Sequence, residues 1–455
     1  MSYIKLSGVD EAIFHKLAIY AKDNNSIKPE YYDIYDIKRG LRNSNGTGVL
    51  VGITEIGEVR GYDLIDNKKI PEEGKLYYRS IELKDLVEGV QKEKRFGFEE
   101  CIYLLIFGQL PTKEELNDFN QLLGKLRFLP EGFNEKMILL YPSKDVMNQL
   151  QRSVLSMYTY DESVDENSIS NLTSQSLNLI AKLPALAIYS YQAKIHNYDK
   201  QSLFIHPPQP HLSTAENILY MTRADSNYTE LEAEVLDLSL IVHAEHGGGN
   251  NSSFTTHVLA SSGTDSYSVI AAAIGSLKGS KHGGANFKVY KMIEAIKEEL
   301  EDFRDRNELK NYLRKILKKE AFDKQGLVYG MGHAVYTKSD PRAVLLKKKA
   351  EELAKDKGLE DDYKLYANIE DITKELFVEL KGENACICAN VDLYSSFVYR
   401  MLGLPFELFT PIFAIARMAG WCAHRIEQVL SDTKIIRPAY KSVTKIKDYV
   451  PLDER

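Results

Sequence analysis

Apolar residues recur at helical spacing through most of this 455-residue chain. At the start they predict two short amphipathic helices, over residues 10–24 and 29–42, before a turn-rich segment at 43–48. The pattern then changes, because GVLVGITEIGEVRGYDLI alternates apolar with polar residues and is interrupted by glycines. This alternation predicts short β-hairpins between residues 49 and 81, after which the pattern stays helical.

Local signals mark the starts of several of the later helices. Residues 97–108 predict a buried helix between two glycines. Thr112 with Glu115, and Ser213 with Glu216, have the spacing of capping boxes and predict helix starts.

Three further expectations concern helix ends and interruptions. A helix is predicted to start near Ser143, and Pro184 is predicted to kink or divide the helix over 174–194. The next long helical pattern extends through His243 and His246, which are three residues apart and can therefore lie on one helical face.

The charge pattern divides the chain into candidate domains. Helices predicted beyond residue 286 are highly charged, whereas the last helices, over 391–404 and 406–430, are apolar again. The predicted fold class is therefore mainly α, with a minor β-hairpin region near the N-terminus. The expected parts are an N-terminal helical segment (1–45), a large helical domain (46–286 with 391–455) and a small helical lid domain (287–390).

Composition restricts the partners and the location. With 58 basic and 65 acidic residues the net charge is −7, which is too mild and mixed to indicate a nucleic acid or membrane partner. The start lacks a signal-peptide pattern, and no apolar run approaches the roughly 18 residues that a spanning helix needs. The four cysteines show no disulfide or zinc spacing. We therefore expect a soluble cytoplasmic protein. If its ligand is an anion, individual basic side chains at the site must bind it, because the overall charge is negative.

The first candidate for chemistry is the glycine-rich and histidine-rich stretch from residue 241 to 286. Half of the ten histidines lie between His243 and His333. Glycine-rich turns let the backbone approach a ligand closely, although for any single histidine an ordinary helix end is the plainer explanation. His243 and His246 could bind a metal, but Glu245 lies between them on another face and no other ligands complete a site. No metal is therefore predicted.

Other polar residues stand out against their local pattern. His333 lies in a loop between glycines, and Arg342 falls in a first helical turn, where a cation opposes the helix dipole. Asp392 lies near a helix start, where a simple N-cap is the alternative. Arg417 and Arg437 lie among apolar residues, which indicates a carboxylate clamp or an internal salt bridge. An aspartate base, neutral histidine donors and arginine clamps suit proton abstraction next to a carbonyl of a small polycarboxylate.

The motifs that carry these residues, taken in order, resemble the citrate synthase family. They are HAEHGGGN, SLKGSKHGGAN, MGHAVYTKSDPR, NVDLYSS, IARMAGWCAHRIEQ and IIRPAY, with GKLYYRSIELKDLVEG and GFEECIYLLIFGQLPTKEEL upstream and YVPLDER at the end. The resemblance covers roughly residues 45–455. Each motif alone is weak evidence for the family, but the order and spacing of all the motifs together are highly specific for it.

The resemblance implies the catalytic roles. Asp392 would remove a methyl proton from acetyl-CoA, and His282 would donate a hydrogen bond to the thioester oxygen as the enol or enolate forms. His333 would polarise and protonate the oxaloacetate carbonyl. The implied enzyme is an acyltransferase that condenses acetyl-CoA, oxaloacetate and water to citrate and CoA, without a cofactor.

The same resemblance implies the binding residues and the assembly. His246, Arg342 and Arg417 would hold the substrate carboxylates, and Arg437 would reach into the neighbouring subunit's site of a homodimer. The implied CoA contacts are Val328, Tyr329, Gly330, Met331, Gly332 and Lys338. Gly247 and Thr337 depart from residues that are common at these positions in the family.

Three other functions compete with this interpretation. A 2-methylcitrate synthase would use propionyl-CoA with the same catalytic residues, so that only the volume near the acyl methyl group would differ. A metal hydrolase would use His243 and His246. A non-catalytic helical scaffold would need none of these residues.

Overall fold

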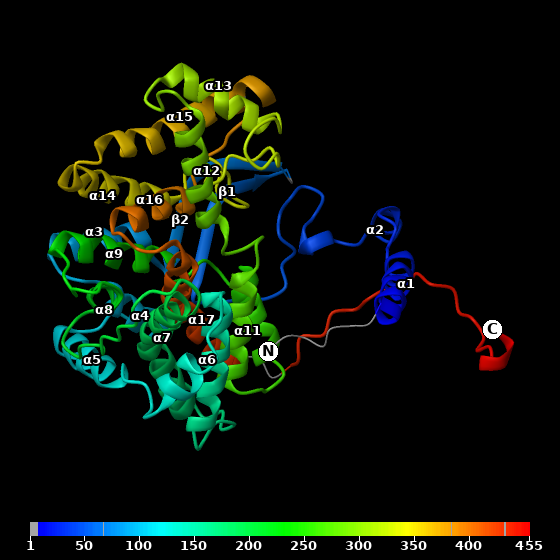
Figure 1. The fold of residues 1–455 in the computed structure, drawn as a ribbon, viewed down its shortest axis with the longest axis horizontal. Coiled ribbons are helices and arrows are strands. Elements are labelled where there is room, and N and C mark those ends of the chain that lie inside the picture. Colours follow the sequence, from blue (N-terminus) through cyan, green and yellow to red (C-terminus); the bar gives the residue numbers. More distant parts are fainter. Residues whose placement is uncertain (1–7, 67, 384, 432–433) are drawn as a thin grey trace. The chain divides into compact units, whose positions relative to one another are not determined.

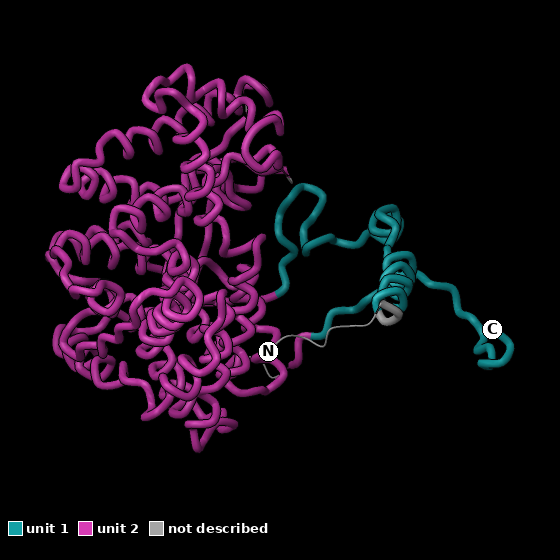
Figure 2. Tube along the Cα trace, viewed as in Figure 1, with its two compact units in different colours: residues 1–51, 437–455 teal, residues 52–436 magenta. Residues whose placement is uncertain are grey.

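The structure is a computed structural model that describes residues 8–66, 68–383, 385–431 and 434–455. It forms two compact units, residues 1–51 with 437–455 and residues 52–436 (Figure 2). The first unit holds α1 (Gly8–Asn24), α2 (Glu30–Ile34) and 3₁₀ turns at Arg39–Leu41 and Leu452–Glu454. Residues 1–7 of the predicted N-terminal segment lie outside the described residues.

The two helices predicted in the first unit are present, but the second is shorter than expected. It ends at Ile34 because Asp36 takes a left-handed conformation (φ 49°), which a continuing α-helix does not allow. A bridge between Arg42 and Gly48 then closes the predicted turn.

The second unit begins with the predicted strands, which form a three-stranded antiparallel meander of β1 (Gly57–Ile65), β2 (Lys68–Tyr78) and β3 (Ile81–Glu82). Residues 49–56 are not in a strand, so the β region starts later than predicted. Tyr78 is fully buried at the end of β2, and its hydroxyl donates to the carbonyl of Ile241 (2.9 Å). The same hydroxyl accepts from the backbone N–H of Glu245 (3.3 Å), so the sheet fixes the chain just after α9 (Glu230–His243).

The core of this unit surrounds α17 (Phe409–Ser431) (Figure 1). Helices that pack against it include α4 (Phe98–Phe107), α7 (Ile169–Tyr198), α9, α10 (Asn251–Ala260) and α11 (Ser266–Lys278). Apolar residues repeat along α17 on every side, and Trp421 is completely buried. A helix that is apolar all round is stable only where other helices cover it, which explains its central position.

Both predicted capping boxes are confirmed. Thr112 and Glu115 cap α5 (Lys113–Leu126), and Ser213 and Glu216 cap α8 (Thr214–Thr222). Three further short elements complete this part of the unit besides α3 and α6. Helix α3 spans Leu83–Lys92 and α6 spans Val146–Ser156. A π-helical turn covers Asn134–Leu139, and 3₁₀ turns cover Met157–Tyr160 and Phe406–Leu408.

The helix predicted to start near Ser143 is present as α6, and of the two outcomes predicted for Pro184 the division of the helix was wrong, whereas a kink stays a prediction. Asp145, not Ser143, caps α6, because the Asp145 carboxylate accepts from the backbone N–H of Asn148 (3.0 Å). Pro184 does not divide α7, which is assigned as one helix on both sides of it. The proline lies where α7 is buried, and packing there outweighs one lost backbone hydrogen bond.

The charged helices predicted after residue 286 are present. They are α12 (Ala285–Glu299), α13 (Arg306–Leu317), α14 (Pro341–Lys357) and α15 (Glu360–Lys381), followed by α16 (Val391–Met401). The division into a large domain and a small domain at 287–390 stays a prediction. Among the described residues, no helix has both the length and the apolar character that crossing a bilayer requires.

Candidate active site

The end of α9 separates the two histidines that were predicted to share a helical face. His243 is the last residue of the helix, whereas His246 lies in the loop beyond it, so that prediction was wrong. Gly247 takes φ 80°, a left-handed conformation typical of a chain leaving a helix. His243 is fully buried, and its Nδ1 lies 2.7 Å from the carbonyl of Ser239. Its role here is therefore structural.

His246 lies against His333 and Tyr336. Its ring centroid is 5.0 Å from that of His333 and 5.6 Å from that of Tyr336. Nδ1 of His333 accepts the backbone N–H groups of Val335 and Tyr336, both at 3.1 Å. An accepting nitrogen carries no proton, so in the neutral ring the proton is on Nε2, which is the hydrogen-bond donor.

Arg342 has an internal partner that the sequence analysis overlooked. Asp340 caps α14 and binds the Arg342 guanidinium through two oxygens, at 3.0 and 2.7 Å. The motif DPR shows this pair in the sequence, because an N-cap aspartate can reach a side chain two residues on. Arg342 is therefore neutralised and held in one geometry.

Arg417 is different, because its positive charge has no bonded carboxylate among the described residues. Its Nε donates to the carbonyl of His243 (2.6 Å), but Nη1 and Nη2 are buried without a hydrogen-bond partner. The alternative of an internal salt bridge is therefore wrong for Arg417. Burial lowers the pKa of Arg417 to about 10, yet the group stays cationic at neutral pH. A buried, half-satisfied guanidinium is costly unless an anion completes it.

His282 lies in the turn after α11, and a serine holds it. Its Nε2 is 3.1 Å from Oγ of Ser252 on α10, and this oxygen also accepts from Nε1 of Trp421 (3.1 Å). The serine proton is therefore directed to His282 or to Oδ1 of Asn250 (2.9 Å). Burial lowers the pKa of His282 to about 4, so the ring is neutral at pH 7. Ser252 was missed from the sequence, where it is one serine in the run NNSS.

The catalytic role that the family resemblance implies for His282 predicts that Ser252→Ala lowers kcat about 10- to 100-fold, because a partner that orients a reacting imidazole has effects of this size. Steady-state kinetics with both substrates would measure it. The matched control is Ser253→Ala, since Ser253 is equally buried and its hydroxyl has no partner. Equal losses in the two variants would contradict the role of Ser252.

Asp392 lies in the first turn of α16, but it is not the helix cap. Asn390 is the N-cap, and its Oδ1 accepts from the backbone N–H of Asp392 (3.0 Å). The alternative that Asp392 is a helix N-cap was therefore wrong, and its carboxylate is available for another role. Burial raises the pKa of Asp392 to about 6, while Arg342 and Arg417 act in the opposite direction.

The loop predicted to contact CoA is bonded to the start of α16. The backbone N–H of Asn390 donates to the carbonyl of Gly330, and that of Gly332 donates to the carbonyl of Cys388, both at 2.8 Å. Gly330 takes φ 84°, and a Cβ there would lie 2.8 Å from Cβ of Leu393, so only glycine fits. The structure thus places residues 328–332 beside the turn that carries Asp392.

The remaining predicted contacts are more dispersed. Val328 is buried, and the Tyr329 hydroxyl donates to Asp323 (2.6 Å). Lys338 is exposed. Arg437 belongs to the first unit, so its contribution to a neighbouring subunit stays a prediction.

Five of the predicted residues influence one another electrostatically: His246, His282, Arg342, Asp392 and Arg417. Arg342 and Arg417 act on the pKa of both His246 and Asp392, and Arg417 also acts on that of His282. Burial, with Arg342 next in effect, keeps the pKa of His246 far below its usual range, so this ring is a neutral donor or acceptor. Neutral imidazoles, one carboxylate base and one unsatisfied guanidinium suit binding of a carboxylate and abstraction of a carbon-bound proton.

Comparison with known proteins shows the family of this chain. The family model "Citrate synthase, C-terminal domain" matches residues 44–439. Citrate synthase from Haloferax volcanii is 34% identical, covering 92% of this chain and 99% of the relative. 2-Methylcitrate synthase 1 from Corynebacterium glutamicum is 32% identical, covering 88% and 97%. The crystal structure of citrate synthase from Thermotoga maritima superposes with a TM-score of 0.71 at 31% identity, covering 92% and 99%.

Fold, site and relatives together define an enzyme of the acyltransferase type. The chain belongs to the citrate synthase family.

Proposed function

We propose that the chain condenses acetyl-CoA with oxaloacetate and water to give citrate and CoA. The observation that carries the proposal is the buried guanidinium of Arg417, which has two free nitrogens and influences His246 and Asp392 electrostatically. A carboxylate of oxaloacetate supplies the bidentate acceptor that this group lacks. Arg342 and His246 bind the other oxygens of the dicarboxylate.

The reaction begins with Asp392, which removes a proton from the methyl group of acetyl-CoA. Such a proton is very weakly acidic, so the enolate oxygen needs a preorganised donor. His282 supplies that donor from Nδ1 when Ser252 donates to Nε2. The enol carbon attacks the ketone of oxaloacetate, and Nε2–H of His333 donates to the ketone oxygen as it becomes an alkoxide. Water then cleaves the citryl thioester and releases CoA.

The assembly and location are part of the proposal. Residues 287–390 close as a small domain over bound oxaloacetate and exclude water, which protects the thioester from wasteful hydrolysis. Residues 328–332 and Lys338 hold CoA, and Arg437 completes the site of a second subunit in a homodimer. The enzyme acts in the cytoplasm. It needs no cofactor, because the CoA thioester is itself a substrate.

A second candidate is the condensation of propionyl-CoA to 2-methylcitrate, which the relatives of that name favour at nearly the same identity. The ratio of kcat/KM for acetyl-CoA and propionyl-CoA decides between the two. We expect a preference for acetyl-CoA, and a clear preference for propionyl-CoA would replace the first proposal with the second.

The pH dependence follows from the raised pKa of Asp392. The base must be ionised to accept a proton, so kcat/KM for acetyl-CoA should be constant above about pH 7 and fall about tenfold per pH unit well below pH 6. A pH–rate profile from pH 4.5 to 8 would measure this, with circular dichroism to confirm that the fold is intact. A profile that stays flat to pH 4.5 would contradict the assignment of the base.

A further inference from the structure

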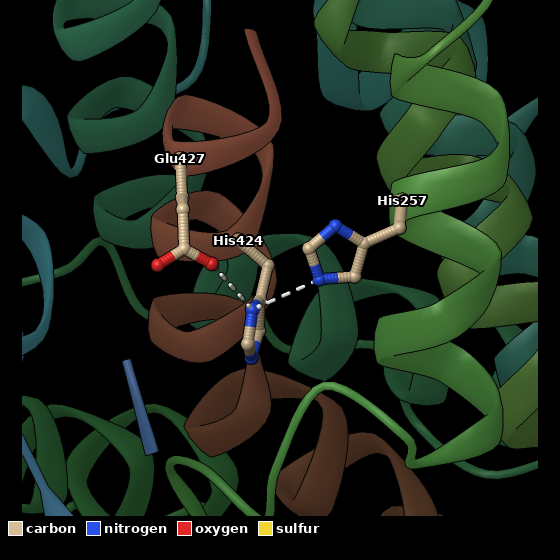
Figure 3. A group of neighbouring side chains, drawn as sticks. All are labelled: His257, His424 and Glu427. Carbon is tan, nitrogen blue, oxygen red and sulfur yellow. Dashed lines mark hydrogen bonds and ion pairs between the residues drawn. The ribbon is translucent and has the colours of Figure 1, made fainter. Parts of the chain in front are cut away.

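A buried chain of hydrogen bonds starts one residue before His246 and continues along α17. Oε1 of Glu245 lies 3.0 Å from Nε2 of His424, and Nδ1 of His424 lies 3.1 Å from Nε2 of His257 on α10. Nδ1 of His257 lies 2.8 Å from Oε1 of Gln428. Figure 3 shows how His257 and Glu427 both approach the same edge of His424. None of these residues has a part in the reaction above.

The protonation states of the two histidines in this series of hydrogen bonds follow from the atoms that they contact. The amide oxygen of Gln428 can only accept, so Nδ1 of His257 carries the proton and Nε2 of His257 accepts. Nδ1 of His424 must therefore donate, and its Nε2 donates to the Glu245 carboxylate. His424 is a buried imidazolium. Its nitrogens then have no lone pair for a metal ion, although His257, His424 and Glu427 are close enough together to suggest a metal site.

Electrostatics agrees with this assignment. Burial acts to lower the pKa of His424, but Glu245 and, to a smaller extent, Glu427 together outweigh it and raise the value to about 9. Burial acts to raise the pKa of Glu245, but His424, followed by Arg417 and the backbone N–H of Gly247, together lower it. Glu245 and His424 are both fully buried, so the two charges depend on each other.

Glu245 also lies next to Arg417. Its second oxygen, Oε2, is buried and has no hydrogen-bond partner within the described part of the chain, and its charge raises the pKa of Arg417. Two glycines shape its position: a Cβ at Gly57 would lie 2.8 Å from Cγ of Glu245, and one at Gly420 would collide with Oε2. Gly420 follows Arg417 by one helical turn and precedes His424 by one, so the carboxylate lies between the two cations.

We propose that His424 is a positioning residue for oxaloacetate binding, which holds the Glu245 carboxylate and keeps it from forming a salt bridge with Arg417. Glu245 is then an internal competitor of the substrate carboxylate. While His424 binds Oε1, the Arg417 guanidinium keeps Nη1 and Nη2 free for the ligand. Without the positive charge of His424, the Glu245 carboxylate pairs with Arg417. Oxaloacetate must then displace that carboxylate in order to bind.

The inference rests on the proposed function, and a double-mutant comparison tests it. His424→Gln removes the charge, and if Glu245 then occupies Arg417 in about 90% of molecules, KM for oxaloacetate should rise about tenfold while kcat changes little. Adding Glu245→Gln to that variant removes the competitor and should return KM to within about threefold of wild type. Packing damage at His424 would not be repaired by a change at a second buried residue.

Glu427→Gln is the matched control, because Glu427 also lies near His424 (3.7 Å) but borders Glu55 rather than the substrate site. Added to His424→Gln, it should leave KM raised. An unchanged KM in His424→Gln, or equal rescue by Glu427→Gln, would overturn the proposal. Wild-type enzyme that neither binds nor turns over oxaloacetate would instead refute the proposed function.

A measurement on proteins that keep His424 covers the case in which His424→Gln does not fold. The charged and titratable groups in contact with His424 are Glu245, His257 from α10, and Glu427 from its own helix. Loss of the His424 proton near pH 9 should raise KM for oxaloacetate between pH 7 and 9 in wild type, a range in which Arg417, with a pKa of about 10, keeps most of its proton. In Glu245→Gln, KM should rise much less over this range, because the competing carboxylate is absent. Constant KM in wild type, or the same rise in both proteins, would contradict the inference.

Discussion

Replacing Asp392 with asparagine should lower kcat by about three orders of magnitude while the protein stays folded, since a positioned general base contributes roughly 10²- to 10⁴-fold. The amide keeps the size of the side chain but cannot accept the methyl proton. Folding should not suffer, because Asn390 caps α16 and the Asp392 carboxylate is not part of the cap. Removing a buried charge whose pKa is raised should, if anything, increase thermal stability.

Asp371→Asn is the control for that change, because Asp371 is an exposed aspartate on α15. Both variants should have wild-type circular dichroism, and only Asp392→Asn should lose turnover of acetyl-CoA. A kcat within tenfold of wild type would show that another group removes the proton.

The second large effect is expected at Arg417. Arg417→Lys keeps the charge but loses the planar pair of donors, so KM for oxaloacetate should rise about 100-fold or more, as when one partner of a buried charge pair is truncated. The melting temperature should change little, because within the described residues this side chain makes one hydrogen bond, from Nε, and otherwise lies over the Phe413 ring (4.8 Å), which a lysine ammonium can also approach.

Arg425 is a matched control on the same helix. It is also buried, but its guanidinium donates to Ser266 (2.8 Å), Asn167 (3.1 Å) and the carbonyl of Thr264 (2.9 Å). Arg425→Lys should therefore lower the melting temperature and leave KM near wild type. If Arg417→Lys were destabilised like Arg425→Lys and kept its KM, Arg417 would be a structural residue.

Much of the helical architecture could be predicted from the sequence, because it depends on local signals. The capping boxes at Thr112 and Ser213 and the alternation in β1 are read directly from neighbouring residues. The end of α9 could not be predicted in this way. It ends at His243 where the Tyr78 hydroxyl, distant in sequence, bonds the following loop.

The candidate site shows the same limit. The order of the motifs indicates His282, His333 and Asp392, but not what each nitrogen or oxygen contacts. Ser252 and Trp421, which hold His282, come from two helices that meet only in the folded chain. Glu245 and His424 are 179 positions apart, and only packing makes them an ion pair. The partner of Arg342 was visible, since Asp340 is two residues away, and was overlooked.

In the proposed reaction, the methyl carbon of acetyl-CoA forms a bond with the ketone carbon of oxaloacetate. The most direct test is the release of free CoA thiol from acetyl-CoA by the purified enzyme, with and without oxaloacetate, and identification of the product. We predict rapid release only when oxaloacetate is present, with one citrate formed for each CoA. Release at the same rate without oxaloacetate, or no citrate in the product, would contradict the account.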